Sequence, residues 1–162
     1  MPVPVPQFLA GEVIPAAKLQ MLGNHGATWT PTLTATTTNP TLGTSPTQTS
    51  LVWLNGQHVT LWFQITFGSG APTAGSGNYT IPLPAQYPAL SGHIESTLGT
   101  VRLVDTSTGA VRLAIATLNL AAQGITMRTT SDNAVVTNSA PWTWAAGDVI
   151  AGTISYLTSF GG

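Results

Sequence analysis

Carboxylates and histidines are the residues with which this chain could carry out acid–base or metal chemistry, and it has few of either. Its five acids are Glu12, Glu95, Asp105, Asp132 and Asp148. A glycosidase needs two carboxylates flanking one bond, and nothing in the sequence brings two acids together, Glu95 and Asp148 included. The three aspartates stand in turn sequences, where an Asp side chain accepts hydrogen bonds from nearby backbone. We therefore expect them to be turn residues.

The three histidines, His25, His58 and His93, do not have the spacing of a metal motif. The chain has no cysteine, which excludes thiolate zinc sites, and it has no GxSxG or phosphate-loop signature. We therefore expect no catalytic residue, no cofactor, no metal and no enzyme activity. A three-fold axis that gathers one histidine from each subunit remains an alternative route to a metal site.

Tryptophan is more informative here than the charged residues. The chain has five tryptophans, at 29, 53, 62, 142 and 144. Packing in the core or in an interface is the expected use of such large rings. Trp62 adjoins Phe63 in an alternating stretch, so one of the two points outward. Trp142 and Trp144 share one face, and we take Trp62, Trp142 and Trp144 as candidate exposed contacts that could stack on a cell-surface glycan.

The composition indicates an assembled protein. Only 6% of the residues are charged, with a net charge of −1, whereas an ordinary soluble domain has roughly 25%. Since so little charge gives little repulsion between copies, we expect much of the surface to be covered by other copies or a partner. The same numbers predict no nucleic-acid partner. No apolar run approaches the roughly 20 residues of a membrane helix, and no signal peptide is expected.

Residues 51–67, LVWLNGQHVTLWFQITF, form the clearest element. Asn55-Gly56 predicts a β-hairpin with a type I′ turn, which would place Val52 opposite Val59 and Trp53 opposite His58. The second arm alternates as a half-buried strand does, and its predicted core side is Val59, Leu61, Phe63, Ile65 and Phe67.

A second hairpin is expected around the turn DTSTG, residues 105–109. The apolar pattern suggests that Val101 and Leu103 face Val111, Leu113 and Ile115, with Arg102 and Arg112 on the other side. The Gly-rich residues 68–78 are expected to be a long hairpin loop, because no phosphate-binding motif accompanies them.

About eight to ten short strands with regular turn signals predict an all-β domain over residues 29–162. A jelly-roll-like antiparallel β-sandwich is the expected architecture. Residues 1–28 are expected to form a separate arm. It opens with MPVPVPQF, whose prolines favour an extended segment, and continues with one short helix between Pro15 and Gly23. The candidate attachment residues on this arm are Val3, Val5, Phe8, Leu19 and Leu22.

Four stretches resemble a family of tailed-bacteriophage virion proteins, the β domains of capsid decoration (head-fibre) proteins, minor tail proteins and tail-fibre tips. They are FLAGEVIPAAKLQML, WTPTLTATTTNPTLGT, FGSGAPTAGSGNYTIPLP and PWTWAAGDVIAGTISY. The resemblance implies a homotrimeric, non-enzymatic protein on the outer surface of the virion. It also implies that the arm attaches the trimer to the major capsid protein or a tail platform.

Two functions of different kinds remain open at this point. The first is a capsid decoration protein, held on the virion by residues 1–28. The second is a receptor-binding tail-fibre or minor tail protein that recognises a cell-surface glycan through exposed tryptophans. An enzyme is the third alternative, and glycan cleavage by the purified protein would identify it.

Overall fold

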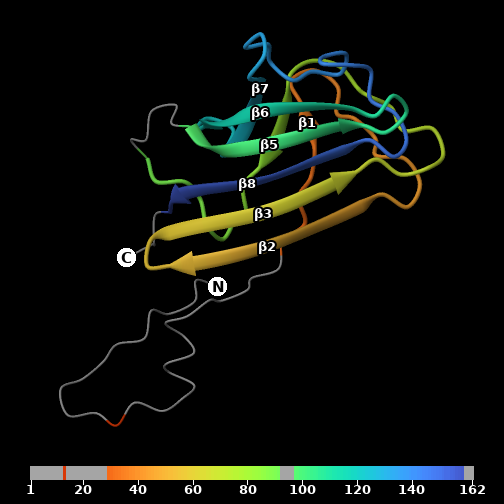
Figure 1. Ribbon diagram of the computed structural model, residues 1–162. Helices are drawn as coiled ribbons and strands as arrows, with labels where there is room; N and C mark the ends of the chain where they lie inside the picture. Colours follow the sequence, from red (N-terminus) through yellow and green to blue (C-terminus); the bar gives the residue numbers. More distant parts are fainter. Residues whose placement is uncertain (1–12, 14–28, 92–96, 159–162) are drawn as a thin grey trace.

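The computed structural model describes residues 13, 29–91 and 97–158 (Figure 1). Within these residues it contains eight strands and no helix. The strands are β1 (Thr34–Ala35), β2 (Thr47–Asn55), β3 (His58–Thr66), β4 (Tyr79–Pro82), β5 (Thr97–Asp105), β6 (Ala110–Asn119), β7 (Gly124–Thr129) and β8 (Val149–Leu157). All pairings are antiparallel, so the predicted all-β antiparallel fold is confirmed. The predicted helix lies outside the described residues.

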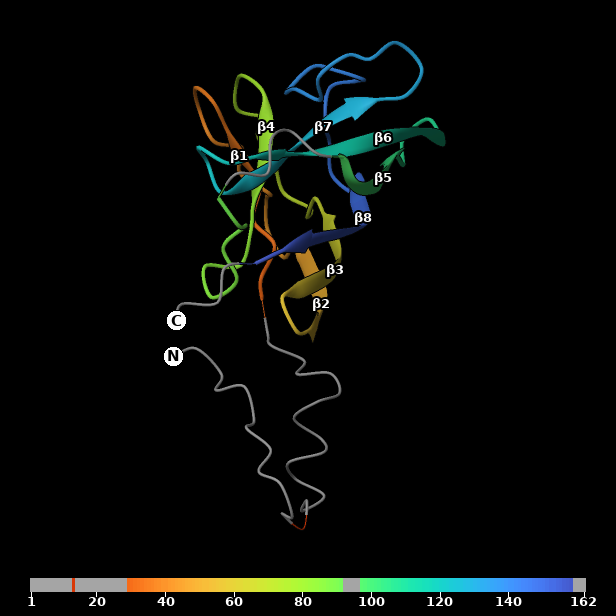
Figure 2. The same cartoon turned by 90° about the vertical axis from the view of Figure 1, so that its left-hand side faces the viewer.

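The eight strands form one continuous sheet in the order β1-β4-β7-β6-β5-β8-β3-β2. The sheet curls strongly along this order, as the view in Figure 2 shows. Trp144 connects the two halves, because its ring packs on Phe67 just after β3 and on Tyr79 in β4, with centroid separations of 5.6 and 5.9 Å. The curled sheet therefore surrounds a single apolar core.

The first hairpin forms where the sequence predicts it, with a different turn. Asn55 pairs with His58, so the two-residue loop is Gly56-Gln57. Gly56 has a φ of 59° and Gln57 is not among the residues with positive φ, which is the type II′ pattern with glycine first. The predicted type I′ turn is therefore wrong, and the predicted register is displaced by one residue on each strand. Val52 lies opposite Leu61, not Val59, and Trp53 lies opposite Thr60, not His58.

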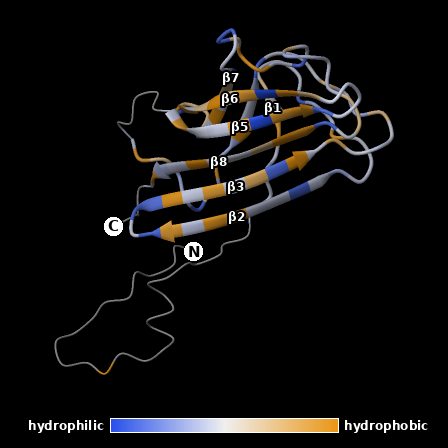
Figure 3. Ribbon diagram, in the orientation of Figure 1, coloured by the Kyte–Doolittle hydropathy of each residue, from blue (hydrophilic) through white to orange (hydrophobic). Residues whose placement is uncertain are grey.

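The faces of this hairpin are nevertheless as predicted. The five residues expected on the core side of β3 and just after it are at most 1% exposed: Val59, Leu61, Phe63, Ile65 and Phe67. Figure 3 shows the alternation of apolar and polar residues along β3. The faces survive because moving the register by one residue on each strand leaves every side chain on its original side.

The Gly-rich residues 68–78 are part of a longer antiparallel ribbon and not a simple hairpin loop. Residues 36–46 run beside them, through single bridges between Thr38 and Ser76, Thr41 and Thr73, and Thr44 and Ser69. These bridges continue the pairing of β1 with β4 at one end and of β2 with β3 at the other. Residues 34–80 thus form one long hairpin. Its open end, β1 with β4, lies at one edge of the sheet, and its closed end, β2 with β3, lies at the other edge.

The second hairpin, β5–β6, has the opposite outcome: its position is as expected and its faces are not. Leu103 pairs with Arg112, and Arg102 pairs with Leu113. Leu113 is 54% exposed and Val111 41%, whereas the inward residues of β6 are Ala114, Ala116 and Leu118. The expectation that Val111 and Leu113 share a buried face with Val101 and Leu103 is therefore corrected. Arg102 and Arg112, expected on the same side, lie on opposite sides of the hairpin.

Candidate functional site

The surface that most merits attention is the outer face of the sheet, the side that points away from the core. Along β3 it carries the even-numbered residues His58, Thr60, Trp62, Gln64 and Thr66, all intermediate or exposed. A representative row crosses four strands from Leu51 to Trp62, Thr153 and Thr100. Such rows hold hydroxyls and apolar side chains in place of the lysines and glutamates usual on a solvated sheet face.

Two apolar groups stand on this outer face. The first, which we call the β2 patch, consists of Leu51, Trp53 and Trp62, with Leu51 52% and Trp53 36% exposed and Trp62 paired with Leu51. The second is Val111 and Leu113 on β6. The outward position of Trp62 is as predicted. Leu51 and Trp53 were not predicted as exposed contacts, although their alternation with the buried Val52 indicates an outward position.

The outer face also carries hydroxyls that bond to one another across neighbouring strands. Thr60 and Ser155 lie 3.0 Å apart between their hydroxyl oxygens. On β6 and β7 the hydroxyl oxygens of Thr117 and Thr126 are 2.9 Å apart. Cross-strand Thr and Ser pairs stabilise a sheet modestly. These four hydroxyls therefore bond across neighbouring strands and belong to the sheet.

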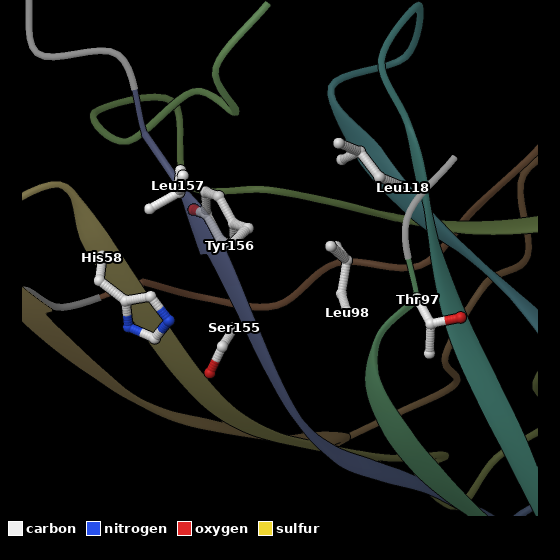
Figure 4. Close-up of a pocket in the computed structure, with 7 residues that line it drawn as sticks. All are labelled: His58, Thr97, Leu98, Leu118, Ser155, Tyr156 and Leu157. Carbon is white, nitrogen blue, oxygen red and sulfur yellow. The ribbon is translucent and has the colours of Figure 1, made fainter. Parts of the chain in front are cut away.

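A pocket of about 200 Å³ opens where β5 and β8 separate (Figure 4). The pairing of β5 with β8 ends at Gly99 and Ile154, and β5 has a register irregularity between Thr97 and Gly99. The gap is lined by His58, Thr97, Leu98, Leu118, Ser155, Tyr156 and Leu157. This volume is below the roughly 300–1,000 Å³ of typical ligand pockets.

The polar groups of this pocket do not form a catalytic set. Ser155 is bonded to Thr60, and the Tyr156 hydroxyl donates to the carbonyl of Tyr87 at 2.8 Å. Burial, with a smaller contribution from Tyr87, raises the pKa of Tyr156 well above its usual range. Tyr156 is therefore a neutral structural donor, and His58 is left without an acid among the pocket residues.

The aspartates are turn residues, as expected. Asp105 accepts hydrogen bonds from the backbone and hydroxyl groups of Ser107 and Thr108, and those from the two hydroxyls are the main reason that its pKa lies below the usual value. The hydroxyl of Thr129 has the same effect on the pKa of Asp132.

Asp148 is fully buried. Unlike the other two aspartates, it accepts hydrogen bonds from a residue that is distant in the sequence. It accepts from the backbone nitrogen of Ala145 at 2.9 Å. It also accepts from the nitrogen and hydroxyl of Thr106, at 3.0 and 3.1 Å. Asp148 thus connects the turn between β5 and β6 to the segment before β8.

The predicted aromatic contacts at the PWTW segment divide into one buried and one half-buried ring. Trp144 is 3% exposed, and its indole nitrogen donates to the carbonyl of Thr137 at 2.8 Å. Trp142 packs against Trp144 with the ring centroids 5.5 Å apart. Trp144 is therefore a core residue that joins Phe67 and Tyr79, which corrects its assignment as an exposed contact. Burial raises the pKa of the neighbouring Tyr79 in the same way as that of Tyr156.

The remaining candidates lie outside the described residues. These are the arm residues Val3, Val5, Phe8, Leu19 and Leu22, together with His25, His93, Glu12 and Glu95. In the described part of the chain, no group of three or more His, Asp or Glu side chains could hold a metal ion. The described residues also include no helix long and apolar enough to cross a membrane.

Comparison of the chain with protein-family models, with curated proteins and with solved structures finds no match.

Proposed function

We propose that this chain is a structural protein of a tailed-bacteriophage virion, a homotrimer that decorates the outer surface of the capsid and is attached by residues 1–28. The observation that carries the proposal is the scarcity of charge on the outer face, where hydroxyls and apolar side chains predominate and the charged residues among those described are Arg102 and Arg128. The exposed charged residues of the described domain are Arg102, Arg112, Arg128 and Asp132. Such a surface suits a domain that packs in an assembly.

The resemblance of four segments to phage decoration and tail proteins supports the same function. The partner in this proposal is the major capsid protein, or a tail platform, and the attachment residues are Val3, Val5, Phe8, Leu19 and Leu22. The domain has no expected cofactor and no catalytic role. Its contribution to the particle is a rigid, neutral β domain held at the shell surface.

Deletion of residues 1–28 tests this proposal. Virions that carry the gene are grown with the full chain or with the chain lacking residues 1–28, and an antibody against the β domain is used to label them for electron microscopy. The proposal expects head labelling with the full chain and none with the truncated chain. The truncated protein should keep the solution mass of the full-length assembly less the deleted arms. Labelling that survives the deletion would contradict attachment through the arm.

A receptor-binding tail protein is the second candidate, favoured by the aromatic side chains on the outer face. Trp53 and Trp62 stand on neighbouring strands beside hydroxyl and amide side chains, a combination that can stack on sugar rings and bond to their hydroxyls. Replacing Trp62 or Trp142 by alanine should then abolish adsorption to host cells. Normal adsorption by both variants would argue against this function.

We also propose that the curled sheet belongs to the jelly-roll-like sandwich class expected from the sequence. The supporting observation is that Trp144 packs on residues from both halves of the sheet. An experimental structure in which the hydrogen bonds of the sheet are interrupted into two packed layers would support this classification. An uninterrupted sheet would exclude it.

A further inference from the structure

Strand β2 is an edge without the usual protection. It is the last strand of the sheet, and β3 is its only neighbour. Its nine residues, TQTSLVWLN, contain no proline and no charge, and they pair with β3 in unbroken register. Natural proteins normally shorten, bend or charge such an edge, because its free backbone groups recruit another strand. The opposite edge, β1, is only two residues long.

The free backbone groups of β2 can be assigned to particular residues. In a two-residue hairpin the pair next to the loop, here Asn55 and His58, is a hydrogen-bonded pair, and such pairs alternate along the strands. The odd-numbered residues of β2 therefore bond to β3. The N–H and C=O groups of the even-numbered residues point to the open edge, and these residues are Gln48, Ser50, Val52 and Leu54.

These edge groups have no backbone partner in the described part of the chain. The segment nearest to β2 contacts its side chains only: the carbonyl of Pro31 accepts from Gln48 at 2.6 Å, and that of Trp29 accepts from Ser50. The ring of Trp29 packs on Phe63, whose side chain is on the core face. Residues 29–31 thus cover the core face of β2 and leave its backbone edge open.

We propose that a second copy of this chain pairs with this edge, with β2 antiparallel to β2 about a two-fold axis at Leu51. This register places Ser50 opposite Val52 of the second copy, and Gln48 opposite Leu54 of the second copy. All four edge residues are then used, which gives about eight backbone hydrogen bonds, two for each pair. Main-chain pairing of this kind is a common source of affinity in strand addition.

The side chains of β2 fit this partner. Leu51, which is 52% exposed, meets its own copy at the axis as a non-hydrogen-bonded pair, where side chains approach most closely. Trp53 lies opposite Thr49 of the second copy. No charged residue occurs on β2, so the two copies meet without repulsion. The prolines at positions 2, 4 and 6 make the Pro-rich start of this chain a poorer occupant, since each lacks a ladder donor.

The two-fold contact goes beyond the proposed function, because a homotrimer needs a three-fold interface elsewhere on the surface. The two contacts have different effects on the solution mass. If the two-fold and three-fold axes meet at right angles, both contacts together give six chains, whereas β2 pairing alone gives two chains and the three-fold contact alone gives three. Light scattering on the full chain, whose mass is 16.7 kDa, separates these cases.

The test replaces Leu51 by glutamate, which places two like charges face to face at the axis. The control is Ala121→Glu, because Ala121 is exposed in the turn after β6 and belongs to neither apolar group of the outer face. We expect an even number of chains in the wild-type assembly, half that number for Leu51→Glu, and no change for Ala121→Glu. A fall from six chains to three supports both proposals. A fall from two to one supports β2 pairing and overturns the trimer.

Two results overturn β2 pairing. A wild-type trimer that Leu51→Glu leaves intact would do so while supporting the three-fold assembly, and a wild-type monomer would overturn both proposals.

A crosslink tests the same axis without adding charge. The chain has no native cysteine, and non-hydrogen-bonded antiparallel residues have Cα atoms about 4.5 Å apart, within the range of a disulfide. Mild oxidation should convert Leu51→Cys to a covalent dimer much faster than Leu113→Cys. Equal rates for the two variants would overturn the proposed register, even if Leu51→Glu fails to fold.

Discussion

The hairpins β2–β3 and β5–β6 differ in how their faces relate to their sequences. In β2–β3 the predicted turn is wrong, yet every side chain lies on the predicted side. In β5–β6 the turn is where it was expected, and the faces of β6 are reversed. The comparison shows that which side chains are buried depends on whether the loop has an even or an odd number of residues, which we call its parity, and not on the exact register.

The loop of β5–β6 shows how one residue changes that parity. A five-residue loop over residues 105–109 would pair Val101 with Leu113 and Leu103 with Val111, as the apolar pattern suggests. In the structure Asp105 remains in the strand and pairs with Ala110, so the loop has four residues. The carboxylate of Asp105 accepts from Ser107 and Thr108, which closes the turn over residues 106–109.

The two hairpins also differ in their neighbours. β2 is at the edge of the sheet, whereas β5 and β6 are each paired on both sides. Ala114 and Ala116 face the core on β6, near the larger Met127 of β7. Val111 and Leu113 are larger apolar residues of β6 that lie on the outer face, while Leu118 lies in the core. An interior strand can therefore leave large apolar residues outside, because neighbouring strands fill the core.

The largest expected effect is a difference in stability between substitutions on the two faces of the hairpin β5–β6. Leu103→Ala should cost about 2–5 kcal/mol of unfolding free energy, because it opens a cavity at a fully buried site. Leu113→Ala should change the stability by no more than about 0.5 kcal/mol, as is usual for surface substitutions. Urea unfolding of both variants measures the difference. Equal losses of unfolding free energy for the two variants would indicate that Leu113 is buried, as a five-residue loop would place it, and would contradict the contrast between the hairpins.

A smaller effect tests the turn of β2–β3. Gly56 has a φ of 59°, so Gly56→Ala should cost about 1–2 kcal/mol through the left-handed backbone alone. Apart from Gly56 and its two chain neighbours, no heavy atom lies within 4 Å of where a Cβ would stand, so packing against the rest of the fold adds no cost. Asn55 is a strand residue, so Asn55→Thr should stay within about 0.5 kcal/mol of the wild type. A large loss for Asn55→Thr in the same unfolding assay would indicate the type I′ turn instead.

The smallest expected effect is the pH dependence of the β5–β6 turn. Hydrogen bonds hold the pKa of Asp105 in the folded chain below its ordinary value of 3.8. A group with a lowered folded pKa stabilises the fold above its unfolded pKa, and this contribution is lost as the pH falls through the folded value. The thermal midpoint of the wild type should therefore fall in acid below about pH 4.

Asp105→Asn should have a lower midpoint than the wild type at neutral pH and a flatter dependence in acid. Asp132→Asn should flatten the acid dependence in the same direction, because the pKa of Asp132 in the turn after β7 is also lowered. An acid profile that neither substitution changes would contradict the role given to these carboxylates.

Much of the fold could be predicted from local patterns. The alternation of residues 59–67 identified β3 and its buried face, and the turn aspartates were recognised from residue type and position. The buried position of Trp144 was not predictable, because it depends on Phe67 and Tyr79, which are 77 and 65 residues earlier in the chain. The same holds for the hydrogen bonds of Asp148 to Thr106, which connect different turns.

The sequence by itself determined an all-β chain, the sites of both hairpins and the scarcity of charge, because alternation, turn residues and composition are local properties. The tertiary structure decided which strand is the open edge, which face of β6 is buried and which tryptophan is outward. These depend on the order of strands in the sheet and on the parity of loops. The strand order results from how distant strands fill one core. The parity of the β5–β6 loop follows from the hydrogen bonds of Asp105 to Ser107 and Thr108, which the apolar pattern alone does not reveal.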